Sequence, residues 1–141
     1  AGVPTPLVRD VDPEQTTLVF QRVGDCELRQ AVTTGRVRRV AGHLARLHEA
    51  GLVHGDPTTR NVRVRTDEAA PSVFLVDFGL GYHSDHPEDH AMDLQVFRQS
   101  LTGTETDADS LVRAVEEAYR EAGDPAVLER LRAVESRGRY Q

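Results

Sequence analysis

A pattern of elements between residues 36 and 79 constrains the fold of this chain more than any other feature of its sequence. From Arg36 to Ala50, apolar residues recur at steps of three and four, which predicts an amphipathic helix that ends at Gly51. A polar loop, Leu52 to Asn61, follows directly. The sequence therefore predicts a loop that is held in place by the end of a long helix.

Two short strands are predicted after this loop. Residues 62–65 alternate between Val and Arg, and residues 73–76 form an apolar run. The segment between them, 66–72, contains the Asp, Glu, Ala and Pro residues that are typical of a turn. We expect the two strands to pair as a β-hairpin whose second strand delivers Asp77.

Helices are expected in the C-terminal half of the chain. Helical patterns cover residues 88–102, 107–122 and 125–135, and Asp124 is suited to cap the last of them. The predicted fold class is therefore α+β, mainly helical, with one small hairpin.

The N-terminal residues are expected to be less regular. Residues 1–17 lack a periodic apolar pattern and are expected to form an extended lead-in, followed by a short buried strand at 18–20. A short helix over 26–33 would then carry Leu28 inward.

Three polar residues stand at the ends of these predicted elements. Asp56 and Asn61 lie in the loop, and Asp77 follows the hairpin. Phosphoryl transfer needs a carboxylate that orients the attacking hydroxyl group, and oxygen ligands for magnesium. Asp56 suits the first role, whereas Asn61 and Asp77 suit the second. Each motif alone also occurs in ordinary turns, so the prediction depends on their order and context.

This order of elements resembles the C-lobe of a protein kinase. The loop at 54–61, HGDPTTRN, is similar to the HGD-x-TT-x-N loop of the atypical serine/threonine kinase of the KEOPS complex, the PRPK or Bud-type family. Residues 77–94 resemble that family's DFGL segment and the PEDKAVDL-like start of its next helix, and residues 137–139 resemble its RGR tail. The resemblance covers nearly the whole chain, and an archaeal member is expected.

The resemblance assigns roles to particular residues. It implies that Asp56 is the catalytic base, that Asn61 and Asp77 hold Mg²⁺, and that Asp93 is a buried carboxylate that braces the catalytic loop. Thr58 would stand where ordinary protein kinases have a Lys that faces phosphate.

The resemblance also implies a hinge and a division of the chain. Residues 18–24 are similar to the strand and linker before a C-lobe, so Phe20 would be the gatekeeper, and the Gln21 carbonyl and Val23 amide would contact the adenine of ATP. Residues 1–24 would be the end of the N-lobe and the hinge, 25–136 the C-lobe, and 137–141 a basic tail.

Cellular function and partners come from the resemblance alone. It implies a kinase or ATPase subunit that uses Mg-ATP and supports threonylcarbamoyladenosine modification of tRNA, with the tRNA-modifying ATPase and other KEOPS subunits as partners. Arg137 and Arg139 in the tail are candidates for contact with tRNA, because local Arg clusters suit phosphate. The net charge of −6 argues against a basic field over the whole surface. A cytoplasmic protein is expected, since no stretch is long enough to cross a bilayer.

Lysine does not occur in the chain, and all 17 basic residues are Arg. A kinase N-lobe supplies a Gly-rich loop and a Lys that grips the phosphates of ATP, and neither is found here. The sequence therefore predicts that most of the N-lobe lies outside this chain, and that the chain alone binds ATP poorly.

Other interpretations of the sequence stay open. A RIO-like or aminoglycoside-phosphotransferase-like kinase also uses an HGD…N loop, and a pseudokinase-like scaffold would bind partners without catalysis. A zinc site could be built from the spaced histidines, and RNA could be bound by the Arg residues that begin the long helix. Cys26 is expected to be a small packed residue and not a nucleophile. The candidate zinc ligands are His83, His86 and His90, and the candidate RNA-binding residues are Arg36, Arg38 and Arg39.

Overall fold

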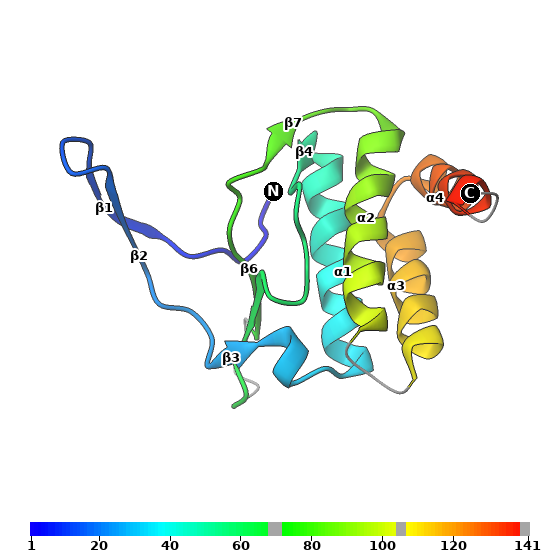
Figure 1. Ribbon diagram of the computed structural model, residues 1–141, viewed down its shortest axis with the longest axis horizontal. Coiled ribbons are helices and arrows are strands. Elements are labelled where there is room, and N and C mark those ends of the chain that lie inside the picture. Colours follow the sequence, from blue (N-terminus) through cyan, green and yellow to red (C-terminus); the bar gives the residue numbers. More distant parts are fainter. Residues whose placement is uncertain (68–71, 104–106, 139–141) are drawn as a thin grey trace.

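A computed structural model describes residues 1–67, 72–103 and 107–138 of the protein. Within these ranges, four helices lie on one side and three small antiparallel sheets lie on the other (Figure 1). The fold is α+β, as predicted. In chain order the elements are β1 Val8–Asp12, β2 Thr17–Phe20, β3 Cys26–Glu27, the 3₁₀ turn η1 Leu28–Gln30, α1 Thr34–Glu49, β4 Leu52–Val53, β5 Val62–Val64, β6 Val73–Leu75, β7 Tyr82–His83, α2 Pro87–Thr102, α3 Ala108–Ala122 and α4 Pro125–Gly138.

Helix α1 is central to the core, and its position agrees with the prediction. The Thr33 side chain caps it by accepting a hydrogen bond from the backbone N–H of Arg36, at 3.2 Å. Val40 and Leu44, on its apolar face, are fully buried. The helix stops before Gly51, whose φ of +67° is the left-handed conformation that glycine adopts readily.

Helices α2 and α3 pack against α1, and α4 packs against α2 and α3. α3 packs along α1, while α2 contacts both α3 and α4. Asp124 caps α4 as predicted, since its carboxylate accepts a hydrogen bond from the N–H of Ala126 at 2.9 Å. Helix α4 continues to Gly138, beyond the predicted end at 135. Of the predicted basic tail, positions 137 and 138 are therefore helical, and residues 139–141 lie outside the described part of the chain.

The predicted hairpin is present as β5 and β6. Val62 pairs with Leu75 and Val64 with Val73, so the same face of both strands is buried against the helices. β3 joins the other edge of β5, which gives the sheet order β3-β5-β6. The sheet thereby brings the residues after β6 next to the loop that precedes β5.

Two predictions of local structure were wrong in part. The segment from residue 26 to 33 forms β3 and one 3₁₀ turn in place of a helix, because Cys26 pairs with Val64 of the hairpin. Leu28 is nevertheless fully buried, as expected. The loop from residue 52 begins as strand β4, because Val53 pairs with Tyr82.

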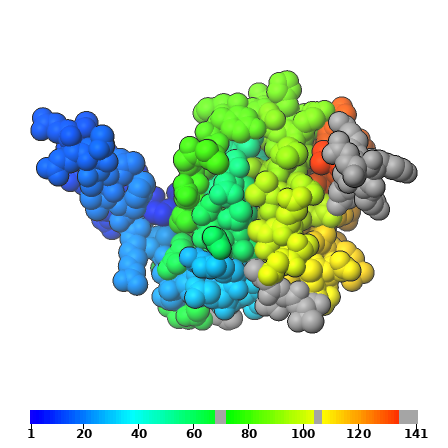
Figure 2. Space-filling view, in the orientation of Figure 1, coloured from blue at the N-terminus to red at the C-terminus, as the bar shows by residue number. Residues whose placement is uncertain are grey.

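The N-terminal region also differs from the prediction. The lead-in contains strand β1, which pairs with β2 in an antiparallel ribbon that projects from the body of the molecule (Figure 2). Leu18, Val19 and Phe20 are 46–56% exposed, so the expected burial of this strand was wrong. A two-stranded ribbon has no second layer to cover its apolar side chains. Among the described residues, no helix has the length and apolar character needed to span a membrane.

Candidate functional site

Asp56 and Asn61 are joined within the loop after β4. The side-chain amide of Asn61 donates to a carboxylate oxygen of Asp56 and to its backbone carbonyl, each at 2.9 Å. Thr58 lies between them, donating its N–H to the Asp56 carbonyl and accepting from the N–H of Asn61. The loop therefore fixes one oxygen of the Asp56 carboxylate with an uncharged amide.

Asp77 reaches the same edge of the sheet from β6. The N–H of Val76 donates to the carbonyl of Asn61 at 3.0 Å, which ties the start of β5 to the end of β6. Asp77 itself is exposed and has a φ of +63°, a conformation that is strained for a residue other than glycine. Backbone strain of this kind clusters at functional sites, so it supports a role for the exposed carboxylate.

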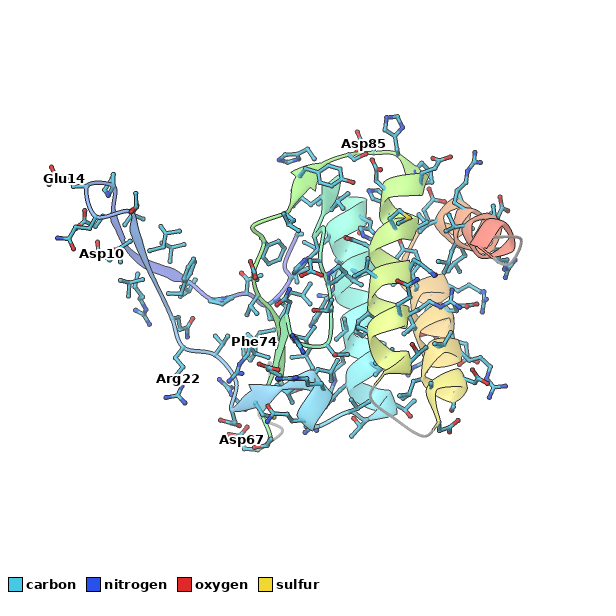
Figure 3. The ribbon with its side chains drawn as sticks, viewed as in Figure 1. Asp10, Glu14, Arg22, Asp67, Phe74 and Asp85 are labelled. Carbon is cyan, nitrogen blue, oxygen red and sulfur yellow. The ribbon has the colours of Figure 1, made fainter. Side chains whose placement is uncertain are left out.

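A hollow of about 1150 Å³ lies between the base of the β1–β2 ribbon and Asp77. Gln21 and Val23 line it from the predicted hinge, together with Asp77, so the structure brings these three residues to one space. Arg22, which Figure 3 labels in the segment between β2 and β3, is also among the residues that line it. Asp56 and Asn61 do not line this hollow. Val76 does line it, and its N–H donates to the Asn61 carbonyl, which connects the loop to the hollow. The hinge contacts to adenine stay predictions.

The buried carboxylate of Asp93 anchors the backbone of the loop, as the resemblance implied. This carboxylate is 2% exposed, and its two oxygens accept the backbone N–H groups of His54 at 2.7 Å and Gly55 at 2.9 Å. Gly55 has a φ of +87°, and a Cβ atom there would lie 2.3 Å from the carbonyl oxygen of Leu80. The loop conformation therefore depends on both the buried carboxylate and a glycine.

His54 connects this brace to β6. Its ring is fully buried, 4.4 Å from the ring of Phe78, and burial lowers its pKa, so the imidazole is neutral. Nε2–H donates to the Val76 carbonyl at 3.1 Å, and Nδ1 accepts the N–H of Asp56 at 3.3 Å. The histidine thus positions the backbone of Asp56 against the strand that delivers Asp77.

Two residues of this network, His48 and Tyr119, were not identified as functional in the sequence. His48 lies 3.1 Å from the Asp93 carboxylate and 2.8 Å from the hydroxyl of Tyr119. His90 stacks on the His48 ring at 4.3 Å. The position of His48 at the end of α1, just before the loop, was the one available signal.

The oxygen atoms at the loop edge fit a magnesium ion. The Asn61 amide nitrogen is used by Asp56, which leaves the Asn61 side-chain oxygen as a candidate ligand, and the exposed Asp77 carboxylate, which follows β6, is a second candidate. Within the described ranges no three His, Cys, Asp or Glu side chains gather as a metal site. Two protein ligands nevertheless suit magnesium, which usually completes its shell with phosphate oxygens and water.

The alternative sites lack this kind of support. His90 is buried in its stack, and its Nε2 lies 2.8 Å from the carbonyl of Ser84, so it does not face a metal with His83 and His86. Arg38, a candidate for RNA contact, is paired with Glu117 and Glu121 of α3.

Comparison of the sequence with known proteins identifies related kinases and tRNA threonylcarbamoyladenosine biosynthesis proteins. Residues 7–119 match the sequence model of the lipopolysaccharide kinase (Kdo/WaaP) family. A probable bifunctional tRNA threonylcarbamoyladenosine biosynthesis protein of Halobacterium salinarum is 60% identical over 141 residues, and the match covers 99% of this chain and 26% of that protein. Its counterpart in Haloarcula marismortui is 58% identical with the same coverage. A probable serine/threonine-protein kinase BUD32 homolog of Archaeoglobus fulgidus is 35% identical, and the chain covers 69% of it.

Proposed function

The chain belongs to the lipopolysaccharide kinase (Kdo/WaaP) family and to the Bud32-type serine/threonine kinases, and from this premise we propose that it forms the C-lobe of a Mg-ATP-dependent phosphotransferase. The observation that carries the proposal is the braced loop, in which Asp93 holds the backbone beside Asp56 while Asn61 holds the carboxylate. Such a loop presents a fixed base next to oxygen ligands for a cation.

Each residue has a separate role in the proposed reaction. Asp56 accepts a hydrogen bond from the attacking hydroxyl or water and directs it at the terminal phosphate. Asn61 holds Asp56 through its amide nitrogen and offers its oxygen to Mg²⁺, and Asp77 supplies the second ligand. The bound ion neutralises charge on the phosphates. Thr58 would face them where other kinases have Lys.

The N-terminal segment is proposed to be the end of an N-lobe. Residues 1–24 would contain its last strands and the hinge, and 25–136 would be the C-lobe. Support comes from the exposed apolar ribbon and from Gln21 and Val23, which line the hollow where adenine would lie. The chain spans only 26% of its bifunctional relatives, whose other segments would supply the remaining groups.

The cellular role is proposed from the relatives' names. Two of them are described as tRNA threonylcarbamoyladenosine biosynthesis proteins, so we infer that this kinase acts with the tRNA-modifying ATPase of the KEOPS complex and its other subunits. Contact between the tail and tRNA, through Arg137 and Arg139, belongs to the same proposal. Either protein phosphorylation or ATP hydrolysis would use the site described above.

The proposal predicts the effect of removing two carboxylates. In the protein expressed from its complete reading frame, Asp56→Ala should lower Mg-dependent turnover of ATP by about a hundredfold or more, because the base is lost. Asp77→Asn should abolish magnesium-dependent turnover and leave the circular dichroism spectrum unchanged. Steady-state turnover at several magnesium concentrations measures both effects.

The control is Asp109→Asn, which removes an exposed carboxylate from the first turn of α3. It should leave turnover unchanged. A wild-type protein that binds partner subunits but shows no Mg-dependent binding or turnover of ATP would favour a scaffold role. Full activity in Asp77→Asn would remove the assignment of that ligand.

A further inference from the structure

Tyr119 of α3 and His48 of α1 form a hydrogen-bonded line that ends at the catalytic loop. We infer that both are positioning residues, which hold Asp56 in place through the carboxylate of Asp93; the inference rests on the proposed function of that loop. Neither residue lines the hollow between the hinge and Asp77, so any effect on catalysis must pass through Asp93.

The line consists of four short contacts. The Tyr119 hydroxyl lies 2.8 Å from Nδ1 of His48, whose Nε2 lies 3.1 Å from Oδ2 of Asp93. Oδ2 also accepts the N–H of His54, and Oδ1 accepts that of Gly55. The three side chains are at most 5% exposed, so water does not compete for these bonds.

The protonation states of His48 and Tyr119 determine which group donates in each hydrogen bond of the line. Burial lowers the pKa of His48 more strongly than the nearby Asp93 raises it, so the imidazole is neutral. The Asp93 carboxylate near Nε2 can only accept a hydrogen bond, so Nε2 carries the proton and Nδ1 accepts from the Tyr119 hydroxyl, whose pKa burial raises. A neutral imidazole carries one proton, which is therefore on Nε2 and is donated to Asp93. Tyr119 thus adds to the preference of Asp93 for the tautomer that the brace requires.

The opposite tautomer would weaken the brace. With its proton on Nδ1, His48 would direct the lone pair of Nε2 at the Asp93 carboxylate, and two acceptors would face each other in a buried site. Asp93 would then lose the bond that fixes its orientation, while still holding the two loop amides. The position of Asp56 would become less defined, which lowers the rate without changing the nucleotide pocket.

Tyr119 and His48 are held by neighbours on three helices. The N–H of Gly123 donates to the Tyr119 carbonyl at 2.7 Å, and a Cβ atom at position 123 would lie 2.5 Å from the tyrosine ring. His90 of α2 stacks on His48 with an interplanar angle of 3°. Three carboxylates, from Glu49, Asp85 and Asp124, line a hollow of about 440 Å³ beside both rings. The line therefore couples the packing of α1, α2 and α3 to the loop.

A pair of substitutions at His48 separates the hydrogen bond from packing. His48→Gln places an amide N–H near the position of Nε2 and can still donate to Asp93, whereas His48→Leu cannot. In the complete protein, we expect His48→Leu to lower kcat by about ten- to a hundredfold, with KM for ATP unchanged. His48→Gln should recover most of that loss.

A second variant, Tyr119→Phe, removes one oxygen and keeps the ring. Its kcat should fall by about tenfold, because the tautomer is no longer fixed. Protonated imidazole carries a proton on both nitrogens, so the ratio of variant to wild-type kcat should rise as the pH falls toward the pKa of His48. The ¹⁵N chemical shifts of His48 should change from the values of a single tautomer to those of a mixture of both tautomers. The control is Val115→Ala, a buried substitution on the same helix. It should lower stability, and its kcat relative to wild type should not change with pH.

The outcomes distinguish this inference from the proposed function. Equal kcat values for the Gln and Leu variants at position 48, or a single unchanged tautomer in Tyr119→Phe, would overturn the inference while the wild type stays active. A wild-type protein without Mg-dependent turnover would remove the proposed function, and the inference with it.

Discussion

Gly55 lies in the loop between β4 and β5 at a position that leaves no room for a side chain. Its left-handed φ is unfavourable for other residues, and the carbonyl of Leu80 occupies the space of a Cβ atom. Its N–H also donates to Asp93. A side chain at this position would therefore move the backbone next to Asp56, which no rearrangement of a flexible side chain could avoid.

Substitution of Gly55 should accordingly cost both stability and turnover. We expect Gly55→Ala to lower the free energy of unfolding by about 1–3 kcal/mol, from strain and the clash together. Urea denaturation measures this change. Gly42→Ala is the matched control, because Gly42 lies inside α1 with open space at its Cβ position. That control should stabilise the protein by up to about 1 kcal/mol. Equal effects at the two positions would contradict the strain argument.

His43 makes the stability of the fold dependent on pH. Burial, with a smaller contribution from Arg46, lowers its pKa from 6.5 to about 4. The folded state therefore keeps His43 neutral, while the unfolded chain takes up a proton below about pH 6.5. Stability is complete above that pH and is lost as the pH falls toward 4.

The change should be measurable in urea denaturation at several pH values. Between about pH 7 and pH 5, we expect the free energy of unfolding to fall by about 1–3 kcal/mol from this group. His43→Leu should flatten the dependence without removing it, because burial also lowers the pKa values of His48 and His54. If the free energy of unfolding changed with pH equally in the variant and the wild type, groups other than His43 would control this dependence.

Candidate site residues could be identified where a local motif carried them, and their roles stay predictions. Asp56, Asn61 and Asp77 stand in short strings whose order is readable along the chain, and Asp93 follows from the resemblance. His48 and Tyr119 could not be found in this way, because they are 71 positions apart and become neighbours only when α1 packs on α3. Their functional interest arises from a contact, not from a local pattern.

At the scale of elements, predictability followed the range of the interactions. Helix α1 was predicted with both ends, because its apolar period and Gly51 are local signals. The short segments at 26–33 and 52–53 were assigned wrongly, because each becomes a strand only by pairing with a distant partner, Val64 or Tyr82. Strand β1 was missed for the same reason, because it acquires its conformation by pairing with β2, whereas the strand at 18–20 is present as predicted.

For the whole molecule, the distribution of charge around the hollow determines what this chain can bind by itself. Its hinge side is largely apolar and Asp77 lies at the other end, with Arg22 and Arg63 as its basic lining residues. A nucleotide base would pack against these apolar side chains. Its phosphates would lack the Lys that kinases provide, since the chain contains none.

The 141-residue chain should therefore bind Mg-ATP more weakly than the complete protein does. Each lost hydrogen bond to a charged phosphate removes about 1.5–3 kcal/mol, so we expect Kd to rise by at least tenfold and up to about a hundredfold. Titration calorimetry of both proteins measures the difference. Adenosine is the control ligand, because it has no phosphate and its Kd should change far less. If ATP bound equally well to both proteins, the phosphates would have to be held within this chain, and Arg22 and Arg63 would be the first residues to replace.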